Sequence, residues 1–159
     1  MILIKNGKVY SNGRFQKRDL YVENGHFSHK GESDEVFDAE GRFIIPGFWD
    51  IHTHGAMCVD VNAADREGFE RISTFLASHG VTRWLCSILT DDEERTTAAI
   101  LRAREAIENP LPGAKLMGIH LEGPFLSPKF AGAMPPHLII EGNVALMERY
   151  VKASGNNIR

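Results

Sequence analysis

Two short stretches of the chain place metal-binding residue types at alternate positions and then end in glycine. WDIHTHG carries His52 and His54, and GIHLEG carries His120 and Glu122. Side chains two positions apart in a β-strand point to the same face, so each strand would present its pair together. Neutral imidazole and carboxylate groups are good ligands for a divalent transition metal. The two stretches therefore predict one metal site built from the ends of two strands.

The residues of these stretches are expected to have different roles. Glu122, His52 and His54 are the predicted metal ligands, because a carboxylate that would be costly to bury alone is compensated by the charge of a metal ion. His120 and Asp50 lie one pleat deeper, and we expect them either to support the ligands or to be hydrogen-bonded residues of the core, rather than to bind the metal. A single HxH pair, or Glu122 by itself, would also fit ordinary hydrogen-bonded structure. A metal site is predicted because both motifs, and not one alone, lie at the ends of strands.

The surrounding sequence from Phe43 onward alternates between strand and helix patterns, which is typical of parallel βα units. Strands are predicted at FIIPGFWDIHTH, VTRWLCSIL and KLMGIHLEG, and NNIR resembles the approach to a fourth strand. Apolar residues recur on one helical face over about residues 65–79, 91–108 and 143–153. Parallel βα barrels carry their chemistry at the carboxyl ends of the strands, which is where both motifs lie.

Residues 1–47 have a different pattern, with short apolar runs separated by turns. ILIKNGKVY and LYVENGHF each place Asn-Gly between apolar runs, which predicts two hairpins because both residues tolerate positive φ. DAEGRFIIPGF adds a further turn and strand. These strands are too few to bury both faces of a sandwich, so we expect part of a small β-sandwich module.

The predicted fold class is therefore α/β. Residues 48–159 are expected to form an incomplete (β/α)8 TIM-type barrel, with the first three βα units and the start of the fourth, after the β module of residues 1–47. A closed barrel takes roughly 200 residues or more, so the chain is expected to be the front part of a larger protein.

Composition narrows the class of protein. The chain has 159 residues with 43% hydrophobic and 25% charged residues, which is typical of a globular protein. Its net charge is −3, from 18 basic and 21 acidic residues, which argues against a nucleic-acid partner. No apolar run approaches the roughly 18 residues of a membrane span, and MILIKNGKVY lacks the pattern of an export signal, so we expect a protein that is neither exported nor inserted in a membrane. Two cysteines without a disulfide framework fit a reducing cytoplasm, which is the predicted location.

Both motifs resemble known family signatures. IPGFWDIHTHG is similar to the first-strand signature of the amidohydrolase superfamily, and GIHLEGPFLSPKFAGAMPPHLI resembles the distinctive segment of N-acetylglucosamine-6-phosphate deacetylases. The resemblance implies metal-dependent hydrolysis of the acetamide of N-acetylglucosamine 6-phosphate to glucosamine 6-phosphate and acetate, in amino-sugar catabolism. It also implies one or two divalent ions, zinc or iron, a phosphorylated amino-sugar substrate, and a homodimer of the full-length protein.

The resemblance also implies roles for single residues. Glu122 matches the metal ligand shared across the family, and His52 and His54 match a pair that binds a second metal in the members that keep it. Ala133 and Met134 fall where the family contacts the sugar; one common version has histidine at the second position, so contact at Met134 would be through backbone or apolar atoms. The family's catalytic aspartate is expected beyond residue 159, so the chain alone is expected to be inactive.

Two other interpretations stay open. The chain could belong to another amidohydrolase that acts on a cyclic amide or a nucleobase, although HLEGP argues against this. It could also be a non-catalytic truncated fragment that pairs through unfinished barrel edges, since open strand edges are templates for association.

Overall fold

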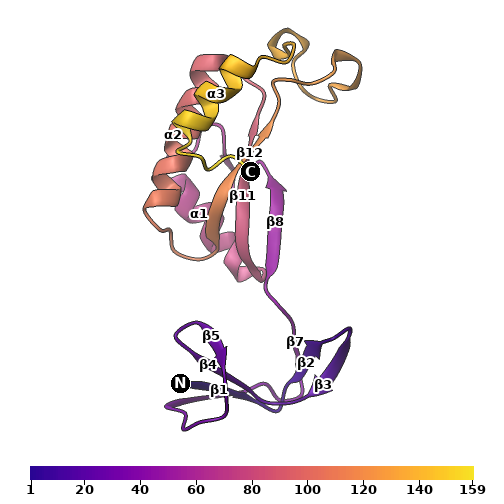
Figure 1. Cartoon of the computed structure of the whole chain (residues 1–159), viewed down its shortest axis with the longest axis vertical. Helices are drawn as coiled ribbons and strands as arrows, with labels where there is room; N and C mark the ends of the chain where they lie inside the picture. Colours follow the sequence, from indigo (N-terminus) through magenta and orange to yellow (C-terminus); the bar gives the residue numbers. More distant parts are fainter. The chain divides into compact units, whose positions relative to one another are not determined.

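A computed structural model describes all of residues 1–159 as two compact units, Met1–Pro46 and Gly47–Arg159. The predicted domain boundary lies next to this division. Figure 1 shows that the first unit contains only strands, whereas the second combines strands with helices. No helix in the chain is both long enough and apolar enough to cross a bilayer.

The Met1–Pro46 unit consists of short strands in two sheets. The larger sheet has the order β5-β4-β1-β6, and the smaller has the order β3-β2-β7. Few apolar side chains of this unit are buried, namely Val9, Leu20 and Ala39, so its core is small. Its strands are β1 (Ile2–Lys5), β2 (Lys8–Ser11), β3 (Arg14–Lys17), β4 (Leu20–Glu23), β5 (His26–Ser28), β6 (Glu35–Asp38) and β7 (Phe43–Ile44).

The two Asn-Gly pairs of this unit have different roles. Asn24 and Gly25, with φ of 52° and 77°, turn the chain between antiparallel β4 and β5, so this predicted hairpin is confirmed. The hairpin predicted at Asn6 is wrong, because β1 pairs with β4 and β6 while β2 pairs with β3 and β7. Asn6 instead donates through Nδ2 to Asp38 at 3.0 Å and through its main-chain N–H to Asp19 at 3.1 Å. These hydrogen bonds to residues distant in the sequence hold Asn6 where the chain passes from the first sheet to the second.

A parallel sheet with the order β12-β11-β8 forms the centre of the Gly47–Arg159 unit. Helices connect its successive strands, in agreement with the alternation of the sequence. Ile158 adds a parallel bridge to Ile119 of β12, at the place of the predicted fourth strand. The elements are β8 (Phe48–Thr53), β9 (Gly55–Ala56), β10 (Val59–Asp60), α1 (Arg66–Ser78), β11 (Val81–Leu89), α2 (Glu93–Glu108), β12 (Lys115–Glu122), the 3-10 turns Pro128–Phe130 and Pro136–Leu138, and α3 (Val144–Ala153).

A polar side chain caps the N-terminus of each of the three α-helices. The side-chain oxygens of Asp65, Asp92 and Asn143 each accept a hydrogen bond from the main-chain N–H three positions further along. Such a cap satisfies one of the N–H groups that the first helical turn leaves without a partner. The helix starts are therefore determined by local chemistry.

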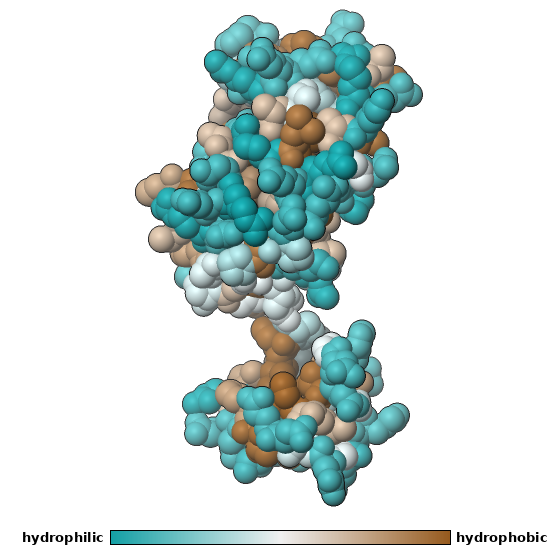
Figure 2. All heavy atoms as spheres, turned by 90° about the vertical axis from the view of Figure 1, so that its left-hand side faces the viewer, coloured by the Kyte–Doolittle hydropathy of each residue, from teal (hydrophilic) through white to brown (hydrophobic).

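The helices cover one face of the sheet (Figure 1) and bury the core against it. Alternate β11 residues Trp84, Cys86 and Ile88 lie in this core, together with Phe69 of α1 and Ile100 of α2. The outward side of the helices is mostly hydrophilic, with scattered apolar residues (Figure 2). Ser87, which alternates with Cys86 and Ile88, points to the opposite face of the sheet, where the predicted metal site lies.

The apolar residues of β8 do not pack on helices. Ile51 is 64% exposed, and Phe48 and Trp49 of the same strand are also exposed. The reason is the position of β8, which is an edge strand of the sheet, whereas α1 and α2 pack over β11 and β12.

Candidate metal centre

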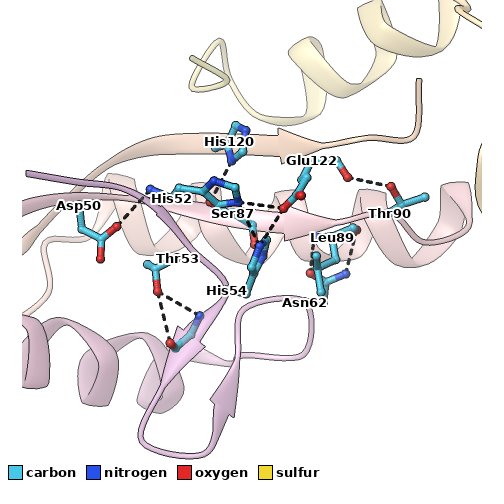
Figure 3. Close-up of polar contacts among 11 residues, drawn as sticks. Asp50, His52, Thr53, His54, Asn62, Ser87, Leu89, Thr90, His120 and Glu122 are labelled. Atoms are coloured by element: carbon cyan, nitrogen blue, oxygen red, sulfur yellow. Dashed lines mark hydrogen bonds and ion pairs between the residues drawn. The ribbon is translucent and has the colours of Figure 1, made fainter. Parts of the chain in front are cut away.

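His52, His54 and Glu122 meet at the carboxyl end of the parallel sheet (Figure 3). The Oε2 atom of Glu122 lies 2.9 Å from Nε2 of His52 and 2.8 Å from Nε2 of His54. The two Nε2 atoms lie 3.2 Å apart. The structure therefore brings together all three predicted ligands, from strands that are distant in the sequence.

The strand order explains how these side chains reach one another. His52 and Glu122 belong to the two outer strands, β8 and β12, and β11 lies between them. In the ladder, Ser87 is opposite His120 and Leu89 is opposite Glu122. The ladder between β8 and β11 ends at Thr53, and His54 lies immediately beyond it. Side chains on this face of both outer strands can therefore meet above β11.

The hydrogen bond of His54 to β11 decides which of its nitrogens can bind an ion. Its Nδ1 lies 2.9 Å from the carbonyl oxygen of Ser87, and a carbonyl only accepts, so Nδ1 carries the proton. In the neutral ring Nε2 then has a free lone pair, which faces the Glu122 carboxylate. Two such acceptors can approach to 2.8 Å only with a proton or a cation between them. A metal ion would satisfy this contact with a neutral imidazole.

The donor set fits a zinc-like ion. Two imidazole nitrogens and one carboxylate oxygen are a common ligand combination, and donors around a tetrahedral ion with bonds of about 2.0–2.1 Å lie roughly 3.3 Å apart. The three donor atoms here all lie within 4.8 Å of one another. Their side chains are 51%, 35% and 32% exposed, for His52, His54 and Glu122 respectively, so one side of the group is open to solvent. An ion held here would keep positions for further ligands.

The electrostatics of the site favour the protonation state that metal binding requires. The hydrogen bond with His52 lowers the pKa of the Glu122 carboxyl, and the nearby histidines act in the same direction. Burial lowers the pKa of the His120 imidazole, and the neighbouring His52 lowers it further. Glu122 is therefore a carboxylate and His120 a neutral ring at neutral pH.

The residues predicted to support the ligands lie beside the group of three. Oδ1 of Asp50 accepts a hydrogen bond from the main-chain N–H of His52 at 3.1 Å. His120 shares a hydrogen bond of 2.9 Å between its Nδ1 and Oγ of Ser87. Its ring also packs edge-on against His52, with ring centroids 4.8 Å apart. Both predicted roles remain predictions, with these contacts in their favour.

The predicted sugar-contacting residues lie in the segment after β12, between the two 3-10 turns. Ala133 is exposed, whereas Met134 is 8% exposed and its main-chain N–H donates to the carbonyl of Ala131 at 3.1 Å. The structure does not bring either residue into the group of donor atoms. Their role in binding a substrate stays a prediction.

Two residues that organise the strand ends were missed by the sequence analysis. Ser87 contacts His54 and His120, and Asn62 pairs through its side-chain amide with both main-chain groups of Leu89 (Figure 3). A polar residue that alternates with core residues in VTRWLCSIL was the available signal for Ser87. No local signal exists for Asn62, whose partner is 27 positions away.

Sequence comparison finds similar deacetylases, although no protein-family profile matches the chain. The N-acetylglucosamine-6-phosphate deacetylase of Bacillus subtilis (strain 168) is 36% identical over 130 residues, which cover 80% of this chain and 33% of the relative. The enzyme of Danio rerio with the same name is 32% identical over 91% of this chain and 39% of its own length. The N-acetylgalactosamine-6-phosphate deacetylase of Escherichia coli O157:H7 is 29% identical over 78% of this chain and 33% of its own length.

Solved structures resemble the chain over nearly its whole length. The N-acetylglucosamine-6-phosphate deacetylase of Thermotoga maritima has a TM-score of 0.74 and 27% identity, over 95% of this chain and 39% of that one. The enzyme of Pasteurella multocida has a TM-score of 0.85 at 21% identity, over 98% and 42% of the two chains, which shows the shared fold. The chain spans 33% to 42% of the lengths of these proteins.

Proposed function

Because this chain belongs to the N-acetylglucosamine-6-phosphate deacetylase family and matches a portion of its members, we propose that it forms the first part of a (β/α)8 barrel enzyme. The parallel sheet supports this proposal, since its strands neighbour one another in sequence order with helices between them, as in such a barrel. The reaction proposed for the complete protein is hydrolysis of the acetamide of N-acetylglucosamine 6-phosphate to glucosamine 6-phosphate and acetate.

The meeting of His52, His54 and Glu122 carries the proposal. We assign these side chains to one or two divalent ions, zinc or iron, because their lone pairs converge and one imidazole has its other nitrogen bonded to a carbonyl. When bound, such an ion supplies Lewis-acid chemistry, which activates water and polarises an amide carbonyl.

The remaining work in this part of the site belongs to the protein groups. The Ser87 carbonyl keeps the proton of His54 on Nδ1, and Glu122 holds negative charge at the strand end. Ala133 and Met134 are proposed to contact the sugar. Proton transfer between water and the leaving amine is assigned to an aspartate outside residues 1–159. We therefore propose that residues 1–159 alone bind metal without turning over substrate. We also propose, from the family resemblance, that the full-length protein is a cytoplasmic homodimer.

Metal content per chain tests the ligand assignment. The 159-residue chain would be saturated with zinc, desalted and analysed for metal, beside the double variant His52→Ala, Glu122→Ala. A matched control is His79→Ala, Glu108→Ala, which removes an exposed histidine and glutamate elsewhere on the same unit. We expect metal in the parent and the control, and none in the first variant. Equal metal content in all three would contradict the assignment.

Release of acetate tests the proposed reaction. The full-length protein should release acetate from N-acetylglucosamine 6-phosphate, and Glu122→Ala should abolish this. The galactosamine epimer belongs in the same assay because one relative is named for it. Acetate release by the 159-residue chain itself, lost in Glu122→Ala, would overturn the proposal that this part alone is inactive.

A further inference from the structure

Ser87 lies in the middle strand of the sheet and contacts two histidines through two different groups. Its main-chain carbonyl accepts a hydrogen bond from Nδ1 of His54 at 2.9 Å. Its side-chain Oγ shares a hydrogen bond of 2.9 Å with Nδ1 of His120. Ser87 is fully buried, so both contacts are shielded from competing water.

His52 differs from His54 in how its ring is held. Its Nε2 faces His54 and Glu122, but its Nδ1 has no protein hydrogen-bond partner. A histidine that binds metal usually has its second ring nitrogen fixed by a hydrogen bond. Here the ring of His120 packs against His52 instead, with centroids 4.8 Å apart and planes at 70°. The orientation of His52 therefore depends on a neighbour that Ser87 holds in place.

We propose that Ser87 is a positioning residue of the metal centre, which orients His54 through its carbonyl and His52 through His120. The inference rests on the proposed function, since the ligand roles of the two histidines are assigned there. Both Nε2 atoms must stay close to the Glu122 carboxylate for the three groups to share one ion, and Ser87 restrains both rings. Loss of a supporting hydrogen bond of this kind weakens metal binding by about 10–100-fold.

The contribution of the Ser87 hydroxyl can be separated from its carbonyl by substitution. Ser87→Ala removes Oγ but keeps the main-chain contact to His54. Ser87→Thr keeps the hydroxyl, and Ser87→Val has nearly the same shape as threonine with a methyl group in its place, so comparing the last two variants tests the hydroxyl group. Ser73 offers a matched control, because it is also fully buried and its Oγ accepts a hydrogen bond from Nε1 of Trp84 at 3.2 Å, in the core of the same unit.

The experiment measures zinc affinity of the 159-residue chain by competition with a chromophoric chelator, and the visible spectrum of bound cobalt(II). We expect Ser87→Ala and Ser87→Val to bind zinc about 10–100-fold more weakly than the parent, with a changed cobalt spectrum. Ser87→Thr should recover most of the affinity. Ser73→Ala should keep the affinity and spectrum of the parent, although it loses a buried hydrogen bond.

The outcomes separate this inference from the proposed function. Zinc affinity that is the same in the parent, Ser87→Ala and Ser87→Val would overturn the positioning role while leaving the metal centre intact. An equal loss in Ser73→Ala would also overturn it, because the effect would then come from general destabilisation. A parent chain that binds no zinc at the His52 and Glu122 side chains would overturn the metal centre and the positioning role together.

Discussion

Replacement of Asn62 by alanine is expected to lower the free energy of unfolding of the Gly47–Arg159 unit by about 2 kcal/mol. The side chain of Asn62 donates through Nδ2 to the carbonyl of Leu89 at 3.0 Å and accepts through Oδ1 from the N–H of Leu89 at 2.8 Å. Arg102 of α2 holds the same loop, donating to the main-chain carbonyl of Asn62 at 2.7 Å. Alanine at position 62 would leave both main-chain groups at the end of β11 without a protein partner.

The magnitude follows from these two hydrogen bonds and their burial. One intramolecular hydrogen bond contributes a net of about 1 kcal/mol, and a buried group left without a partner costs roughly 1–3 kcal/mol. Asn62 and Leu89 are both only partly buried, so in the alanine variant water can hydrogen-bond in part to the main-chain groups of Leu89. The expected loss of stability is therefore near the sum of the net contributions of two hydrogen bonds, about 2 kcal/mol, rather than near the full desolvation penalty.

Urea unfolding followed by tryptophan fluorescence measures this change, because Trp84 is buried in the core of this unit and the only other tryptophan, Trp49, belongs to the same unit. Asn62→Asp serves as a shape-matched variant: it keeps the acceptor for the N–H of Leu89 but places a second oxygen against the Leu89 carbonyl. We expect it to be no more stable than Asn62→Ala. Asn109→Ala is a control, since it removes a single bond to the exposed end of α2 and should cost less than about 1 kcal/mol.

Two results would contradict the expected role of the Asn62 side chain. A loss below about 0.5 kcal/mol in Asn62→Ala would mean that the amide pair contributes little to the net stability. A stability of Asn62→Asp equal to that of the parent would mean that the bond from Nδ2 to the Leu89 carbonyl is unimportant.

Three further predictions concern the metal site, the thiols and the loop after β8. Zinc at a hundred times its Kd should raise the free energy of unfolding of the parent in urea by about 2.7 kcal/mol. Glu122→Gln should abolish this increase, but in EDTA it should lower the stability by less than about 1 kcal/mol, because the ion pairs of Glu122 are partly exposed. Stabilisation of Glu122→Gln by zinc would contradict the metal site. Burial raises the pKa of Cys86 to about 12, so at pH 8 a thiol reagent should label Cys58 quickly and Cys86 only after unfolding; equal labelling rates would show that Cys86 is accessible. Gly55 has φ of 137°, and a Cβ at this position would overlap a main-chain oxygen of β10. Gly55→Ala should therefore lower the free energy of unfolding by more than about 2 kcal/mol in the same assay. Gly142→Ala, where a Cβ meets nothing within 4 Å, should lower it little.

The elements of the second unit could be predicted because their signals are local. Asp65, Asp92 and Asn143 cap the helices within a few residues of the apolar stripes that they start, and β11 is the full predicted stretch VTRWLCSIL. The alternate spacing in HTH and HLE also predicted which side chains share a face, and the common direction of parallel strands brought them to one end of the sheet.

The features that could not be predicted depend on contacts between distant parts of the chain. The Asn-Gly pair at Asn6 has the sequence of a hairpin turn. Asn6 instead donates from its main chain to Asp19 and from its side chain to Asp38, at the point where the chain passes from one sheet to the other. The exposure of Ile51 follows from the position of β8 at the edge of the sheet, which its own residues do not encode. The contacts of Ser87 with two histidines, each 33 positions away, arise only when three strands are aligned.

The separation of the ligands along the chain also has a kinetic consequence. His52 and Glu122 are 70 positions apart, so an unfolded chain must close a long loop to bring them together, at an entropic cost of roughly 4 kcal/mol. The ladders of β11 with both outer strands must form before all three ligands can share an ion. A metal bound to them should therefore stabilise the native state more than the transition state of folding, and slow unfolding while leaving the refolding rate nearly unchanged.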